Sequence, residues 1–125
     1  MAQDIISDAL NQIMNAKKAK KEEILVEHSS VFLLQILEIA KENEYLDYEI
    51  DKKNNKLKIS IKNLMECKTI KPRYYVKKDE IEKYLRRYLP ARGFGIVLVS
   101  TSQGLMTHTQ AQEKQIGGSL VAYFY

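Results

Sequence analysis

The sequence predicts an α+β protein made of two small, packed α/β subdomains. Three observations support this class. Apolar residues recur at helical spacing in the first half, two runs there alternate apolar and polar residues, and the second half holds a continuous apolar run between glycine and serine. With 125 residues, the chain is long enough to bury one core shared by both subdomains. We place the boundary between residues 64 and 65.

Residues 1–64 are predicted to fold in the order α-β-α-β-β. Two segments carry apolar side chains on one helical face, so we expect helices over residues 4–17 and 30–42. A short strand is expected at residues 24–26. Two alternating runs, residues 46–50 and 57–61, flank a polar stretch at residues 51–55 whose composition is typical of a turn. This half therefore ends in a β-hairpin.

Residues 65–125 are predicted to be rich in strands, with short helices. The expected elements, in chain order, are a strand over 69–76 bent at Lys71-Pro72-Arg73, a helix over 78–88 stopped by Pro90, a buried strand over 94–99, a short helix from about 107 to 114, and a last strand over 119–125. Thr107 and Gln110 have the spacing of a capping box, which is why a helix is expected to begin there.

Composition excludes several classes of protein. A single cysteine, Cys67, rules out an internal disulfide and fits a reducing compartment. His28 and His108 are far apart in sequence, so we expect no metal site, and nothing in the sequence calls for another cofactor. No apolar run approaches the roughly 18–20 residues of a membrane span, and the N-terminus lacks a signal-peptide pattern. We therefore expect a cytoplasmic protein.

Charge is distributed unevenly between the two halves. Residues 1–64 carry a balance of −1 and residues 65–125 a balance of +5. All four arginines belong to the second half: Arg73, Arg86, Arg87 and Arg92. Because the guanidinium group binds phosphate in a bidentate way, this distribution indicates a polyanionic partner for the second half. On charge alone, a basic protein with scattered surface charge is an equal alternative.

The candidate site is the stretch Ser100-Thr101-Ser102-Gln103-Gly104. A buried strand is expected to deliver these hydroxyls and the glycine to the N-terminus of a helix, where hydroxyls and bare backbone suit phosphates, sugars and base edges. Such groups match the shallow minor groove of RNA with its 2′-hydroxyls. Arg73 and Arg92 are expected to contact phosphate, and Gly117-Gly118 to bring further bare backbone to the same surface.

Other interpretations of this stretch remain open. One is a serine hydrolase that uses Ser102 and His108, although no acidic residue nearby in sequence orients the histidine and no G-x-S-x-G motif is present. A second is a turn, rich in serine and glycine, with only a structural role. Tyr84, Tyr88 and Tyr123 follow apolar patterns and are expected in the core.

Several motifs together resemble the ribosomal protein S8 family of the small subunit. They are Lys71-Pro72-Arg73, the run from Arg87 to Gly95, the run from Ser100 to His108, and Gly117-Gly118. The tail Ala122-Tyr123-Phe124-Tyr125 and the segment Leu89-Pro90-Ala91-Arg92 are similar to the archaeal and eukaryotic branch, the S-fifteen-A type. The opening segment, residues 4–16, is similar to the first helix of the family, so the resemblance spans nearly the whole chain.

The resemblance implies a non-enzymatic protein that binds small-subunit rRNA directly in its central domain, aids assembly there and touches neighbouring small-subunit proteins. An RNA-binding translational regulator is the alternative. The residue match adds a second contact at the opening helix. The residues expected at RNA are thus Asn15, Lys18, Arg73, Arg92, Ser100, Thr101, Ser102, Gln103, Gly104, Thr107, Gly117 and Gly118.

The chain also departs from the family pattern. The region around residues 17–23 and the hairpin turn are shorter and less glycine-rich than in the family. Two further departures concern single positions. Asp4-Ile5 stands where the family usually has Asp-Pro, which implies a different helix start. Gln103 stands where bacterial members often carry lysine, which implies that one phosphate contact is missing. None of these departures touches the motifs that carry the resemblance.

Overall fold

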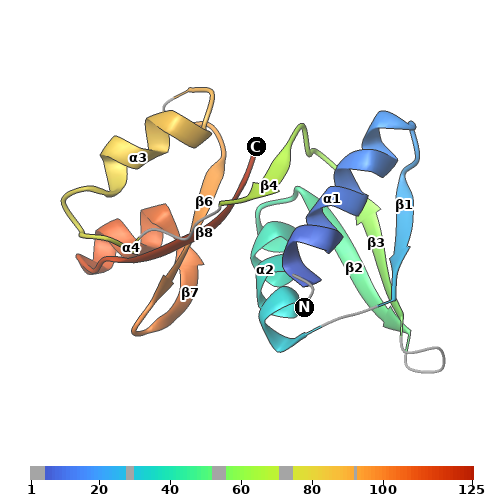
Figure 1. Cartoon of the computed structure of the whole chain (residues 1–125), viewed down its shortest axis with the longest axis horizontal. Helices are drawn as coiled ribbons and strands as arrows, with labels where there is room; N and C mark the ends of the chain where they lie inside the picture. Colours follow the sequence, from blue (N-terminus) through green and yellow to red (C-terminus); the bar gives the residue numbers. More distant parts are fainter. Residues whose placement is uncertain (1–4, 28–29, 52–55, 71–74, 92) are drawn as a thin grey trace. The chain divides into compact units, whose positions relative to one another are not determined.

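A computed structural model describes residues 5–27, 30–51, 56–70, 75–91 and 93–125. The chain divides into two compact units, Met1–Glu66 and Cys67–Tyr125 (Figure 1). The predicted hairpin turn, the bend at 71–73, His28, Arg73 and Arg92 lie outside the described residues. No helix in the described part of the chain is long and apolar enough to cross a membrane.

The first unit, Met1–Glu66, has the predicted order α-β-α-β-β. Its elements are α1 (Ile5–Lys18), β1 (Glu23–Val26), α2 (Val31–Glu42), β2 (Leu46–Asp51) and β3 (Lys56–Ile61). The three strands form an antiparallel sheet in the order β1-β3-β2, in which Ile24 pairs with Ile59 and Ile59 with Tyr48. The hairpin expected from the alternating runs is therefore present as β2 and β3, and β1 pairs with the other edge of β3.

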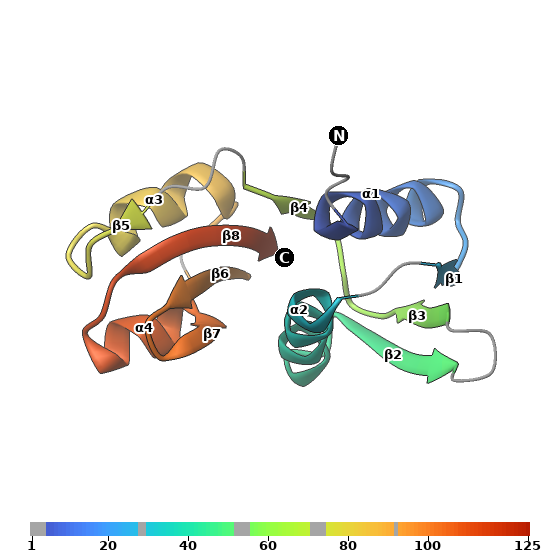
Figure 2. The ribbon, with the colours of Figure 1, turned by 60° about the horizontal axis from the view of Figure 1, so that its bottom comes forward.

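The core of the first unit lies between its helices and one face of the sheet (Figure 2). The apolar faces predicted for the two helices are buried, for example at Leu10 and Ile13 on α1 and at Ile36 on α2. Leu57 and Ile59 of β3 are buried, whereas Lys58 between them is exposed. Each fully buried leucine or isoleucine contributes about 1.5–3 kcal/mol to this packing.

Helices of this chain end without glycine. Lys20, Glu44 and Gln115 have φ values of 61°, 64° and 56°, the left-handed conformation that usually favours glycine. At all three ends the next residue's N–H reaches back five residues, as Lys21 N–H does to Ala16 O at 2.8 Å. These are Schellman endings, and each places a Cβ at a positive φ, where it crowds the neighbouring backbone.

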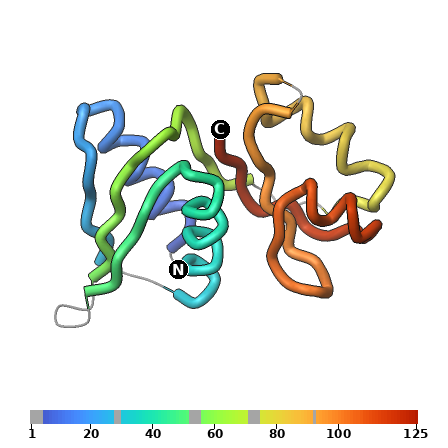
Figure 3. The backbone as a smooth tube through the Cα atoms, turned by 180° about the vertical axis from the view of Figure 1, so that it is seen from behind, coloured from blue at the N-terminus to red at the C-terminus, as the bar shows by residue number. Residues whose placement is uncertain are grey.

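The second unit, Cys67–Tyr125, is rich in strands. Its elements are β4 (Cys67–Thr69), β5 (Tyr75–Val76), α3 (Ile81–Tyr88), β6 (Ile96–Thr101), β7 (Gly104–Thr107), α4 (His108–Lys114) and β8 (Gly118–Phe124). The sheet order is β4-β8-β6-β7, and β5 pairs with β8 beside β4. A register shift next to Leu98 and Val99 marks a bulge between β6 and β8. Figure 3 follows the β6–β7 hairpin as a tight orange loop.

Both helices of the second unit pack on one face of this sheet. Val97 and Val99 of β6 share a buried cluster with Ile81 of α3 and Ala111 of α4. Tyr84, Tyr88 and Tyr123, expected in the core, are half-buried around this cluster rather than fully enclosed. Cys67 is buried, as a small apolar residue would be.

One local prediction is wrong. Residues 104–107 were expected to lead into a helix, but they form strand β7 and pair with β6, with Leu98 opposite Thr107 and Thr101 opposite Gly104. The hydroxyls of residues 100–102 therefore lie at a hairpin turn and not at a helix N-terminus. The two apolar residues of β7 are too few for their spacing to distinguish a strand from a helix entry.

Candidate nucleic-acid interface

The tip of the β6–β7 hairpin exposes the polar residues predicted at the site. Ser102, Gln103 and Gly104 are exposed, and Thr101 pairs with Gly104 across the turn. Gly104 has φ +109°, and a Cβ added there would meet nothing within 4 Å. The glycine is thus required by the backbone conformation, and the space beside it is open to a ligand.

Thr101 holds this turn together. Its hydroxyl donates to Gly104 O at 2.8 Å and accepts from Gln103 N–H at 3.1 Å. By contrast, neither the Ser100 nor the Ser102 hydroxyl forms a hydrogen bond with any other residue that the structure describes. The threonine therefore shapes the loop, whereas the two serine hydroxyls take no part in holding the turn.

A row of side chains crosses the sheet behind the turn. Tyr75 pairs with Ser119, Ser119 with Ser100, and Ser100 with Leu105. Directly opposed residues of neighbouring strands point to the same face, so these side chains lie side by side. Tyr75 is 72% exposed, whereas its neighbour Val76 is buried on the opposite face. The structure thus brings an exposed ring beside two serine hydroxyls.

Sequence reasoning found only part of this row. Tyr74 and Tyr75 are consecutive in the strand predicted over residues 69–76, so alternation predicts that one of them faces outward, and the structure exposes Tyr75. Ser119 was missed altogether. Alternation along the final strand offers a signal for it, but the bulge next to Leu98 and Val99 breaks that alternation, so the face of Ser119 follows only from strand pairing.

Gly117 and Gly118 have structural reasons to be glycine. A Cβ at Gly117 would lie 2.3 Å from Val76 O, and one at Gly118 would lie 2.3 Å from Ser100 O. Both positions face other backbone of the same unit. The close approach expected for a ligand is thus occupied by the protein, and Gly118 serves to hold β8 against Ser100.

Thr107 and His108 are committed to the fold. Thr107 is 8% exposed, and its hydroxyl accepts from Gln110 N–H at 3.3 Å in the predicted capping box. His108 is buried, and its Nδ1 accepts from Val97 N–H at 3.1 Å. Burial lowers the pKa of His108, and the bond to Val97 N–H requires an unprotonated Nδ1.

The hydrolase interpretation finds no support in this geometry. His108 follows Thr107, which pairs with Leu98 at the base of the hairpin. Ser102 is in the turn at the other end, after Thr101, which is three residues beyond Leu98 on β6. At about 3.3 Å per residue the two ends are roughly 10 Å apart. Among the described residues, no three His, Cys, Asp or Glu side chains group to hold a metal ion.

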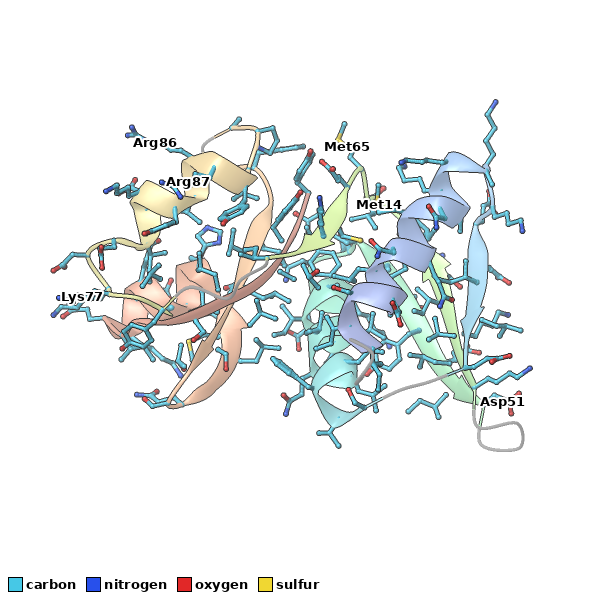
Figure 4. All side chains as sticks on the ribbon, in the orientation of Figure 1. Met14, Asp51, Met65, Lys77, Arg86 and Arg87 are labelled. Atoms are coloured by element: carbon cyan, nitrogen blue, oxygen red, sulfur yellow. The ribbon has the colours of Figure 1, made fainter. Side chains whose placement is uncertain are left out.

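The polar and basic residues outside the hairpin are divided between the units, and Arg86 and Arg87 on α3 were not among the predicted RNA contacts. Asn15 and Lys18 are exposed on the last turns of α1 in the first unit, followed by Lys20 and Lys21. In the second unit, Arg86 and Arg87 are exposed on α3 (Figure 4), and the Arg87 guanidinium carbon lies 5.0 Å from the centroid of the Tyr84 ring.

A small α+β protein with an exposed hydroxyl-and-tyrosine surface and a basic second unit has the features expected of a nucleic-acid-binding module. Comparison with known sequences makes the assignment specific. The family described as Ribosomal protein S8 matches residues 4–125, so the chain belongs to the ribosomal protein S8 family.

Similar proteins come from archaea and from a fungus, and each is called "Small ribosomal subunit protein uS8". The protein of Picrophilus torridus is 36% identical over the whole of both chains. That of Neurospora crassa is 36% identical over 97% of this chain and 96% of its own. That of Thermoplasma acidophilum is again 36% identical over both full lengths. The expected family is therefore confirmed, with relatives in both the archaeal and the eukaryotic branch.

Proposed function

We propose that this chain is a non-enzymatic component of the small ribosomal subunit that binds small-subunit rRNA directly in its central domain and aids assembly. Its partners are that rRNA and neighbouring small-subunit proteins, and it acts in the cytoplasm, in the ribosome. Membership of the ribosomal protein S8 family supports the ribosomal role. The RNA contact rests on the surface formed by Tyr75, Ser119, Ser100 and the hairpin tip, which we call the hairpin face.

One observation carries the RNA contact: an exposed aromatic ring stands in register with two serines. An exposed tyrosine offers a stacking surface to an unpaired base, and serine hydroxyls can both donate and accept at 2′-hydroxyls and base edges. Open space beside Gly104 admits the RNA backbone to the tip. The named residues of this face include no histidine and no carboxylate, and their hydroxyls and ring suit binding.

Two measurements on cells that produce the tagged chain test this proposal. Most of the protein should sediment with small ribosomal subunits. Ultraviolet crosslinking followed by sequencing of the attached RNA should then recover one segment of small-subunit rRNA. Recovery of mainly messenger RNA from non-ribosomal fractions would favour a translational regulator and overturn the ribosomal proposal.

A further inference from the structure

The three-stranded sheet of the first unit has two edge strands, β1 and β2, and their outward backbone groups differ. Tyr45 O accepts from Lys62 N–H, so residues 45, 47 and 49 form the backbone hydrogen bonds to β3. In an antiparallel pair the residues between them point their backbone groups away, so the N–H of Tyr48 faces outward. That N–H donates to Asp47 Oδ1 at 2.8 Å, and Lys41 Nζ lies 3.4 Å from the same oxygen. The outward donor in the middle of β2 is therefore occupied by the strand's own carboxylate.

The β1 edge has no such protection. Glu22 O accepts from Ile61 N–H, so Ile24 and Val26 bond to β3, and the N–H and C=O groups of Glu23 and Leu25 face away from the sheet. No partner among the described residues bonds to these outward groups. An edge with unpaired groups at two-residue spacing is a template for another strand.

A groove runs beside this open edge, where β1 lies at the margin of its sheet next to α1 (Figure 1). It encloses about 920 Å³ between the second half of α1 and β1. Ala16, Ile24 and Leu25 make its apolar part, and Leu25 is 58% exposed. Lys21 lies at the rim, in a basic stretch with Lys17, Lys18 and Lys20.

We propose that the open edge of β1 docks an extended, acidic polypeptide segment of another protein, which adds as a fourth strand. The outward backbone groups of Glu23 and Leu25 fit a peptide main chain. Side chains of the added strand would alternate between the face that carries Leu25 and the face beside α1, where Ala16 lines the groove. Carboxylates on that segment complement Lys21 and its neighbours. Asn15, which the family resemblance assigns to an RNA contact, also lines the groove. Nucleic acid would nevertheless use neither the apolar residues of the groove nor the strand edge, so the observations favour a peptide at β1.

Photocrosslinking in assembled subunits is the first test of this docking, and this experiment rests on the proposed ribosomal function. p-Benzoylphenylalanine replaces Leu25 in one variant and Ile50 in a matched one, since Ile50 is 54% exposed on the other edge strand. After sedimentation with small subunits and irradiation, mass spectrometry should find Leu25 joined to an acidic segment of another protein, at least tenfold above Ile50. Adducts to rRNA or to a second copy of the chain, or equal yields at both positions, would overturn the proposal.

Proline substitution isolates the role of the backbone. Glu23→Pro removes one outward N–H but no bond to β3, as proline on an edge strand allows. It should lower the Leu25 adduct tenfold or more. Glu23→Gln, which removes only the ion pair with Lys58 at 3.4 Å, and Ile50→Pro on the other edge should leave the adduct unchanged. An equal loss with Glu23→Gln would assign the contact to charge and reject an added strand.

A second arm does not depend on incorporation into ribosomes. The purified full chain is titrated with the peptide acetyl-(Glu-Val)₃-amide and followed by nuclear magnetic resonance. The amides of Glu23 and Leu25 should shift and gain protection from hydrogen exchange, while those of Tyr48 and Ile50 should not. If this arm succeeds and the chain does not sediment with small subunits, only the proposed function fails. Shifts spread equally over both edges, or none at millimolar peptide, would reject the docking site.

Discussion

The two units of this protein use different residues to shape their backbones. The first unit contains no glycine, no proline and no arginine, and its ten lysines face twelve carboxylates. The second contains all five glycines, both prolines and all four arginines, and its ten cations face four carboxylates. The first unit has left-handed positions only at residues with side chains, Lys20 and Glu44. The second assigns three of its four such positions to glycine, Gly93, Gly95 and Gly104, and one to Gln115, as far as the described residues show.

This difference indicates where close backbone approach is needed. In the second unit, glycine admits β8 to Val76 and Ser100 and shapes the hairpin tip, so the surface that displays the serines depends on residues without side chains. In the first unit, regular helices and strands need no such approach, and backbone strain is confined to the left-handed residues at the helix ends. Five changes test this contrast, from the largest expected effect to the smallest.

Gly118→Ala should have the largest effect on stability. Its Cβ would lie 2.3 Å from Ser100 O, a backbone atom that moves only if β6 and β8 separate. We expect the free energy of unfolding to fall by about 3 kcal/mol or more. Denaturant titration measures it. Gly93→Asn is the control, because that position has φ +74° and nothing within 4 Å of an added Cβ, and asparagine tolerates this conformation. A loss below about 1 kcal/mol in Gly118→Ala would contradict the packing argument.

Tyr75→Ala and Ser102→Ala should weaken RNA binding without unfolding the protein. Loss of a stacking ring or of a buried hydroxyl partner costs about 1–3 kcal/mol, roughly a 5- to 150-fold lower affinity. Binding to the RNA recovered by crosslinking measures this. Tyr75→Phe should retain most of the affinity. Thr101→Ala should instead lower the stability by about 1 kcal/mol, since its hydroxyl holds the turn. Unchanged binding by a folded Ser102→Ala would assign the hairpin tip a structural role.

The charge contrast is tested by removing cations from each unit. Arg73→Ala with Arg92→Ala should weaken RNA binding more than charge reversal at Lys17, Lys18, Lys20 and Lys21. Each lost phosphate contact makes the log–log salt dependence shallower by about 0.7–0.9, so the arginine pair should reduce the slope by roughly 1.5. A larger loss from the lysines would move the main RNA contact to the first unit. A total slope steeper than about −6 would mean that phosphate contacts, not the serines, dominate binding.

His108 should make the second unit sensitive to acid. The folded pKa of His108 is lowered by burial, so the unfolded chain binds the proton more readily. The buried, neutral His108 therefore contributes its full share to the free energy of unfolding above the ordinary histidine pKa of about 6.5. This share is lost as the pH falls from that value toward the lower pKa of the folded state. Thermal unfolding between pH 7.5 and pH 5 should show this loss in the parent and less of it in His108→Asn. His28→Asn provides the comparison, and an identical pH profile in His108→Asn would contradict the assignment.

Lys20→Gly and Glu44→Gly should each stabilise the protein slightly. Both residues hold left-handed Schellman positions, where glycine avoids the Cβ penalty at some cost in chain entropy. We expect a gain of about 0.5–1 kcal/mol at each position. Lys20→Ala is the matched control and should give no gain, because alanine keeps the Cβ. Should glycine destabilise both ends, side-chain contacts of Lys20 and Glu44 would outweigh backbone strain.

Sequence alone determined the fold class, the element order of the first unit and the family. Long periodic segments such as α1 and α2 bury one face, and that requirement is written in the spacing of Leu10, Ile13 and Ile36. The capping box at Thr107 and Gln110 is equally local, since both of its bonds join residues three apart. The motifs between Lys71 and Gly118 were enough to identify the family, because they are recognised from the order of residues alone, without knowledge of contacts.

Only the tertiary structure decided which residues share a surface. Tyr75, Ser119 and Ser100 meet because three strands pair in one register, and the bulge beside Val99 sets the face of Ser119. Strand pairing likewise made β7 from a segment too short to identify by spacing, turned Gly118 from a presumed ligand contact into a packing position, and left the β1 edge open. Apart from the local β6–β7 hairpin, these properties depend on contacts between residues distant in the chain, so no local pattern encodes them.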